Sequence, residues 1–224
     1  MYRYTRVASL ALAALFVVSC EKSDDDAIAT AQLCLDKANT SSDATACLTK
    51  ISGIDSARAN RVRCGIHFLE GGLNKERFKQ AYIALKNVGS SDSQTLTMMK
   101  YLALSPSSLK DALKAACAKS GMAGMARLGD MAFAATDIAT TIGQTPCQAD
   151  NPASCDWSGI SGATISPAVG QVVIDMANSS CNSNQGTPPS YCNEVNAALQ
   201  GGATATDVAN CLKKKLQNPN ATCP

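Results

Sequence analysis

The sequence holds few side chains whose type and spacing suggest chemistry, and the histidine comes first. His67 is the only histidine, and Glu70 follows it by one helical turn. The two side chains would supply two metal ligands, whereas protein zinc sites use three or four. A Ser-His-Asp triad would also need His67, and the chain has no Gly-x-Ser-x-Gly elbow. We expect an intrahelical polar contact that includes Arg63, with no catalytic residue, metal site or cofactor.

The first nineteen residues have the pattern of an export signal. Arg3 and Arg6 carry positive charge, and residues 7–18 that follow are uncharged. This apolar run is shorter than the ~20 residues that a membrane-spanning helix needs, but it fits the apolar region of a secretory signal. A small residue then precedes Cys20, where we expect cleavage.

The stretch Val17-Val18-Ser19-Cys20 resembles the lipobox of bacterial lipoproteins. The resemblance implies cleavage before Cys20, diacylglycerol on its sulfur and acylation of the new N-terminus, and two or more acyl chains anchor a protein stably. In many Gram-negative bacteria, Asp after this cysteine favours retention in the inner membrane. Because Glu21 stands there, the resemblance implies the outer membrane, facing the periplasm. The alternative is an ordinary cleaved signal with a chance cysteine.

Charge gives little indication of a partner. Removing residues 1–19 leaves eighteen basic and eighteen acidic residues, and nucleic-acid binding favours a strongly basic face, so we expect no nucleic acid. Residues 50–127 nevertheless contain thirteen Lys or Arg and five acids. We predict a binding surface there, and the alternative is an ordinary solvated helix surface. The candidates for the binding surface are Arg58, Arg61, Lys75 and Lys79.

Ten cysteines follow Cys20, and we expect five disulfides because exported chains meet an oxidising compartment. The absence of Cys-x-x-Cys from the sequence argues against a redox centre, a zinc ribbon or covalent haem. The ten are Cys34, Cys47, Cys64, Cys117, Cys147, Cys155, Cys181, Cys192, Cys211 and Cys223.

Apolar spacing and capping residues predict an all-α fold. The sixth helix is typical, since Leu109, Ala112, Leu113, Ala116 and Cys117 recur on one face that we expect to be buried. The predicted helices are 25–38, 42–51, 55–70 with Asp55 as its cap, 74–89 with Asn74 as its cap, 92–104, 106–117, 121–143, a helix capped by Ser166, 192–199 and 204–216.

The stretch 121–143 has the length of a membrane span, but charges interrupt it at Arg127, Asp130 and Asp137. Each charge in a lipid core costs several kcal/mol. We therefore predict a helix rich in small residues that is buried among its neighbours.

Two stretches resemble each other and predict helical hairpins. SDATACLTK at 42–50 matches TDVANCLKK at 206–214. Cysteines placed symmetrically about the turns at 40–41 and 201–202 face each other in an antiparallel hairpin, and a disulfide needs Cα atoms about 4.4–6.8 Å apart. Symmetry predicts Cys34–Cys47 and Cys192–Cys211, locality within a loop adds Cys147–Cys155, and elimination leaves Cys64–Cys117 and Cys181–Cys223.

The stretch RCGIHFLEGGLNKERFKQAYIALK at 63–86 resembles a helical pair of the degenerate TPR-like lipoproteins of Gram-negative bacteria. The resemblance extends over residues 25–120, although the standard Trp, Leu-Gly and Tyr pattern is absent. It implies a short TPR-like solenoid of antiparallel hairpins, stapled by disulfides, with a binding or scaffolding surface.

The predicted organisation has four parts, and the predicted function follows from the anchor. We expect an outer-membrane lipoprotein that binds or organises envelope components without catalysis, with the membrane and an envelope protein as partners. The alternative is a cell-wall or lipid hydrolase with a carboxylate pair, which two close, buried acids in a cleft would favour. The parts are a signal peptide 1–19, a lipidated tether 20–26, a helical domain 27–144 and a Cys-rich helical region 145–224 packed on it.

Overall fold

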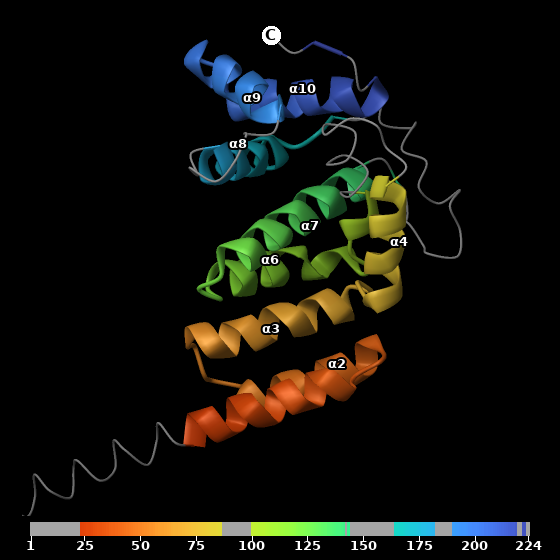
Figure 1. Cartoon of the computed structure of the whole chain (residues 1–224), viewed down its shortest axis with the longest axis vertical. Helices are drawn as coiled ribbons and strands as arrows, with labels where there is room; N and C mark the ends of the chain where they lie inside the picture. The colour runs from red at the N-terminus through yellow and green to blue at the C-terminus, as the bar shows by residue number, and fades with distance from the viewer. Residues whose placement is uncertain are drawn as a thin grey trace, which may run out of the picture.

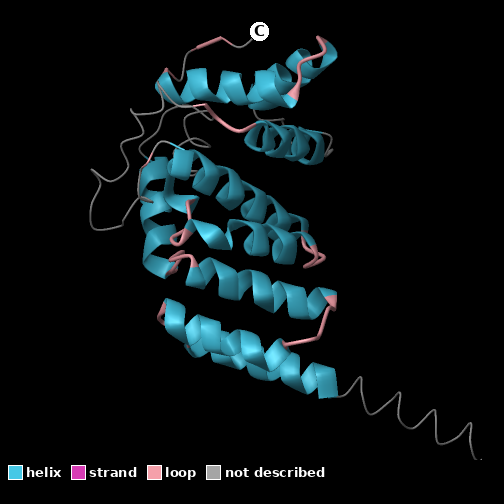
Figure 2. Cartoon of the chain, turned by 180° about the vertical axis from the view of Figure 1, so that it is seen from behind, coloured by secondary structure: helices cyan, strands magenta, loops and turns pink. Residues whose placement is uncertain are grey.

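The computed structural model describes residues 23–86, 100–141, 143, 164–181, 190–218 and 221–222. Throughout these ranges the regular structure is helical, so the predicted all-α class is confirmed. Figure 1 shows the helices stacked along the long axis of the molecule, with the first helix at one end and the C-terminal helices at the other. The view from behind shows the same stack (Figure 2).

The elements begin and end close to the predicted residues. A helix over 23–37 comes first, so residues 23–26, which we expected in the tether, are already helical. The elements that follow are α2 (Ser41–Leu48), η1 (Thr49–Ile51), α3 (Ala57–Glu70), α4 (Lys75–Lys86), η2 (Ser107–Leu109), α6 (Lys110–Ala118), α7 (Ala123–Thr141), α8 (Pro167–Cys181), α9 (Ser190–Gln200) and α10 (Ala205–Gln217).

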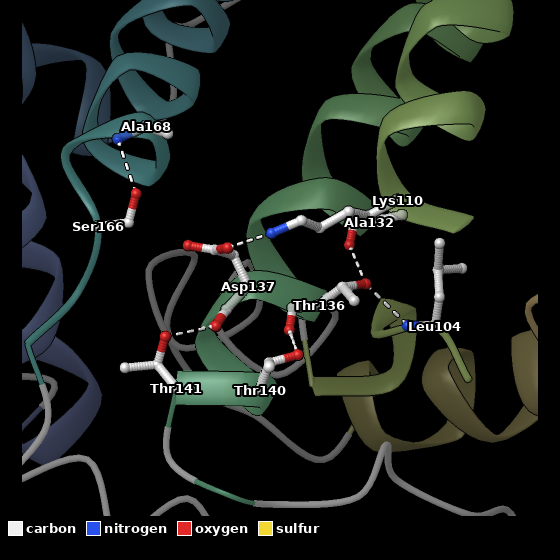
Figure 3. Close-up of polar contacts among 9 residues, drawn as sticks. All are labelled: Leu104, Lys110, Ala132, Thr136, Asp137, Thr140, Thr141, Ser166 and Ala168. Carbon is white, nitrogen blue, oxygen red and sulfur yellow. Dashed lines mark hydrogen bonds and ion pairs between the residues drawn. The ribbon is translucent and has the colours of Figure 1, made fainter. Parts of the chain in front are cut away.

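Two predicted boundaries differ from the structure. Ser56 rather than Asp55 caps α3, because its side chain accepts a hydrogen bond from the Ala59 N–H. Of the helix predicted over 92–104, the described part is helical only at 100–102, and Leu104 lies outside it. The Leu104 N–H instead donates to Thr136 Oγ1 of α7 at 2.8 Å (Figure 3), so a tertiary contact replaces the helical one.

The N-terminal hairpin and α3 share a small core of their own. Cys34 and Cys47 form a disulfide with Cα atoms 5.6 Å apart, which confirms the pairing predicted from turn symmetry. Ala44 is buried on α2 together with Cys47. The buried members of this core are Ile28, Ala31, Ala44, Cys47, Ile51, Ala59, Val62 and Ile66.

A larger core joins α3, α6, α7 and α8. The predicted Cys64–Cys117 disulfide is present and links α3 to α6. A Cβ at Gly129 of α7 would lie 2.7 Å from Cys117 Cβ, so glycine permits α7 to approach this disulfide. On α6, Leu113 is buried as predicted, whereas Ala112 is exposed because α3 and α7 cover a narrower face than the spacing suggested.

The predicted buried helix is α7, whose inner face is lined mainly by small residues. No helix among the described residues combines the length and the apolar character that a bilayer crossing requires. The buried positions of α7 are Gly129, Ala132, Phe133, Ala134, Ala135, Thr136, Ile138 and Ala139.

The C-terminal helices extend the same stack. Ser166 begins α8 as predicted, and its Oγ accepts from the Ala168 N–H at 3.1 Å (Figure 3). Val169 and Val172 of α8, with Ala209 of α10, belong to the core that contains the α7 residues. The C-terminal region therefore packs directly on the helical body.

Candidate functional site

The histidine pair lies at the C-terminal end of α3. His67 Nδ1 and Glu70 Oε2 are 2.6 Å apart, and both residues are buried. The predicted intrahelical contact is confirmed for His67 and Glu70. Arg63 does not join this pair, and its contact within α3 is to Asn60 Oδ1 at 2.7 Å. The Arg63 guanidinium also donates to the carbonyls of Ile51 and Ile54 at 2.8 and 2.7 Å.

The Glu70 carboxylate orients the imidazole. A carboxylate on Nδ1 fixes the ring and leaves Nε2 as the second functional nitrogen. The described residues contain no group of three or more His, Cys, Asp or Glu side chains that could hold a metal ion. Ser41 Oγ of α2 donates to the Glu70 carbonyl at 2.9 Å, so this corner joins α2 to α3.

Arg77 is a buried cation at the start of α4. Its residue is 7% exposed, and it donates to the carbonyls of Ala103 at 2.6 Å and Gly72 at 3.5 Å. Burial lowers the pKa of Arg77 to about 10, so it stays charged at neutral pH. Asn74 caps α4 as predicted, since its Oδ1 accepts from the Arg77 N–H. The guanidinium thus ties α4 to the segment that precedes α6.

The predicted binding surface divides into two separate parts. Arg58, Arg61, Lys75 and Lys79 are all exposed. The two arginines lie at the start of α3, whereas the lysines lie on α4, beyond its other end (Figure 1). A helix of this length spans about 20 Å, so the four side chains do not form one patch.

Half of these basic side chains have acidic partners. Arg58 pairs with Asp25 of the first helix. Lys79 Nζ lies 3.6 Å from Glu76 Oε2. The two pairs are exposed to solvent, where such interactions contribute little stability. They reduce the positive field of both parts of the predicted surface.

A polar cluster between α6 and α7 has no counterpart in the sequence predictions. Lys110 pairs with Asp137 (Figure 3), and Lys114 Nζ lies 3.7 Å from Asp130 Oδ1. Both ammonium groups also lie over the ring of Phe133, 5.0 and 4.7 Å from its centroid. The sequence contains one indication of this cluster: the two lysines are one helical turn apart on α6, and Asp130 and Asp137 are two turns apart on α7.

The pKa of Asp130 on α7 is also affected by a second carboxylate, that of Asp175 on α8. Burial raises the pKa of Asp130, the Lys114 ammonium opposes this rise, and the negative charge of Asp175 adds to it. Asp175 is exposed and accepts a hydrogen bond from Gln171 Nε2 at 2.9 Å. Burial and a second carboxylate that together raise the pKa of an acid are features that acid–base sites also show.

The remaining predicted cysteines lie at the limits of the described residues. Cys20 lies outside them, and so do Cys147, Cys155 and Cys223 and the side chains of Cys181 and Cys192. Cys211 is itself in a disulfide. The pairs Cys147–Cys155, Cys181–Cys223 and Cys192–Cys211 therefore stay predictions. Protein-family models, curated proteins and solved structures were compared with the chain, and none matches it.

Proposed function

We propose that this chain is a lipid-anchored module of the outer membrane that binds other envelope components in the periplasm without catalysis. The observation that carries the proposal is Val17-Val18-Ser19-Cys20, which stands directly before a folded helical body. The disulfides Cys34–Cys47 and Cys64–Cys117 support an oxidising compartment such as the periplasm.

Binding is favoured over catalysis by the uses that the fold makes of its polar side chains. His67 is engaged by Glu70, Arg77 holds carbonyl groups, and Lys110 pairs with Asp137. Stacked helices offer a broad surface, and an anchor confines that surface near one membrane. Confinement raises the effective concentration of membrane-bound partners, so a modest intrinsic affinity suffices.

The anchor is tested by intact-mass analysis of the mature protein from a Gram-negative host. The wild type is expected in the membrane fraction, with its N-terminus at Cys20 and the mass of three acyl chains expected of the family. Cys20→Ser is expected to leave unprocessed precursor or a soluble product. An unmodified mature N-terminus at another residue would contradict the anchor.

Partner binding is tested by crosslinking in cells with two charge-reversal variants. Because the structure separates the arginines from the lysines, Arg58→Glu with Arg61→Glu and Lys75→Glu with Lys79→Glu are compared independently. At least one variant is expected to lose a crosslinked envelope protein while the protein stays folded. His67→Gln, which keeps a hydrogen-bonding side chain, is expected to retain every partner and serves as the control.

The alternative is a hydrolase that acts on cell-wall or lipid substrates with Asp130 and Asp175, although Asp175 is exposed and the two are not the buried pair that this alternative called for. In that mechanism Asp130 would donate a proton and Asp175 would act as the ionised base. Asp130→Asn and Asp175→Asn would then each abolish release of peptidoglycan fragments or fatty acids by the purified protein. The binding module predicts no such release by the wild type or by either variant.

A further inference from the structure

We propose that one edge of the helical stack lies against the lipid surface, so that α4 faces away from the membrane. The edge is formed by the start of α3 and the turn from α6 to α7, residues 119–122. This inference rests on the acylation of Cys20 in the proposed function. It adds the orientation of the helical stack relative to the membrane, and this orientation determines which surfaces can contact a partner.

The short distance along the chain from the anchor to the fold is the first support. The described helix is already formed at residue 23, three residues after Cys20. A fully extended chain covers at most about 3.6 Å per residue. Residue 23 therefore lies within about 11 Å of the acylated cysteine, and the first helical turn is held close to the membrane surface.

Side-chain contacts then connect this turn to the proposed edge. Asp25 pairs with Arg58 at the start of α3. The neighbouring Ala57 packs beside the α6–α7 turn, since a Cβ placed on Gly121 would lie 3.5 Å from Ala57 Cβ. Lys119 Nζ, 3.0 Å from Asp55 Oδ2, adds a second link. Figure 1 shows the start of the first helix, the start of α3 and this turn on the same side of the stack.

The composition of the turn suits a lipid headgroup layer. Residues 120–126 carry no charge, and Lys119 and Arg127 flank them. Met122 is 44% exposed within this stretch. A flexible apolar side chain enters the boundary between headgroups and acyl chains at little cost, while the exposed Lys119 side chain extends its charge toward water.

The other face near the anchor is less suitable. The outer side of the first helix exposes Asp24, Asp26 and Asp36, and contact with lipid would require these carboxylates to lose water. At the edge itself, Arg58 pairs with Asp25 and Lys119 with Asp55, and Arg61 donates to the Ser120 carbonyl. The anchor rather than attraction to anionic lipid therefore holds the edge in place, so the orientation is expected to be independent of the anionic lipid fraction.

The test compares two lysines of the wild-type lipidated protein in vesicles of phosphatidylethanolamine and phosphatidylglycerol. Lys119 at the edge and Lys79 on α4 have side chains that are 60% and 62% exposed, and each is near one acid. Amine acylation, read by mass spectrometry, is measured against the soluble Cys20→Ser protein. Lys119 is expected to react severalfold more slowly in vesicles, with Lys79 unchanged. Equal rates at both lysines, or protection of Lys79 alone, would overturn the orientation.

A matched pair of tryptophans gives a second measurement. Met122 and Ile83 of α4 are 44% and 43% exposed, and Trp157, the single native tryptophan, is replaced by Phe. Brominated lipids are expected to quench Met122→Trp and to leave Ile83→Trp unquenched. Absence of quenching at Met122→Trp in a protein whose mass shows full acylation overturns the orientation and leaves the anchor standing. A mass without acyl chains overturns the proposed function itself, and the orientation with it.

Discussion

Helix α2 at the N-terminal end of the stack and helix α10 at its C-terminal end begin with the same kind of cap. The two helices differ in how they pack. Thr40 caps α2 and Thr204 caps α10, each in a capping box with an aspartate three residues later. The Asp43 N–H donates to Thr40 Oγ1 at 3.2 Å, and the Asp207 N–H donates to Thr204 Oγ1 at 3.3 Å. The similarity of the two stretches in the sequence therefore corresponds to a shared helix start.

The two ends differ in how the following helix is held. In α2, Cys47 is completely buried and bonded to Cys34. In α10, Cys211 at the matching position is also in a disulfide but only half-buried. A close backbone contact is added there, because a Cβ on Gly170 of α8 would lie 1.8 Å from the Ala205 carbonyl oxygen. A helix start is thus encoded within four residues, whereas the buried face depends on the surface that the partner helix offers.

The largest expected effect comes from removing the disulfides. Replacing Cys34 and Cys47 by Ala is expected to cost about 3 kcal/mol of unfolding free energy, because the bond constrains an unfolded loop of 13 residues. Replacing Cys64 and Cys117 removes a bond across 53 residues and is expected to cost about 4 kcal/mol. Urea unfolding measures both. An unchanged midpoint for either double variant would contradict this account.

The next effect concerns the glycine contact at the C-terminal end. Gly170→Ala is expected to destabilise the protein by about 2 kcal/mol, since the added methyl meets the backbone of α10 rather than a flexible side chain. Hydrogen exchange should show the loss at α8 and α10. Gly124→Ala is the control, because nothing lies within 4 Å of a Cβ there. It should be neutral or slightly stabilising, and an equal loss at both glycines would reject the backbone contact.

Local chemistry made much of the fold predictable from the sequence. Asn74 and Ser166 start helices where their side chains indicated, and turn symmetry gave the Cys34–Cys47 bond. These predictions need only the residues of one turn or one hairpin. The first helix begins at residue 23, two residues before its predicted start at Asp25, because acids in a first turn favour the helix.

The features of the fold that could not be predicted from the sequence depend on contacts between residues that are far apart along the chain. The pairing of Lys110 with Asp137 requires α6 and α7 to lie side by side in one register. Gly170 occurs in an apolar stretch, and its role is visible only with α10 beside it. The candidate surface failed as one patch for the same reason, since composition does not tell that α3 separates Arg61 from Lys75.

The smallest effect tests whether the two caps are truly alike. Thr40→Ala and Thr204→Ala are each expected to cost about 1 kcal/mol, because each removes the acceptor for an orphan N–H of the first turn. Equal losses in urea unfolding would show that the cap acts locally. A loss at only one end would show that packing decides the contribution of the cap, and would break the comparison.

The same caps should respond alike to acid. The pKa of Asp43 is lowered by hydrogen bonds with the Thr40 side chain and with the backbone N–H groups of Asn39 and Thr40. The pKa of Asp207 is lowered in the same way by the Thr204 side chain and backbone. Each carboxylate thus stabilises the fold above its unfolded pKa, and this stabilisation is lost as pH falls through the lower folded pKa, below about pH 4. Asp43→Asn and Asp207→Asn should each reduce the fall in urea midpoint between pH 5 and pH 2. Because both carboxylates are exposed to water, the two reductions should be small and similar. A reduction confined to Asp43→Asn would tie the response to the N-terminal disulfide hairpin rather than to the capping box that both ends share.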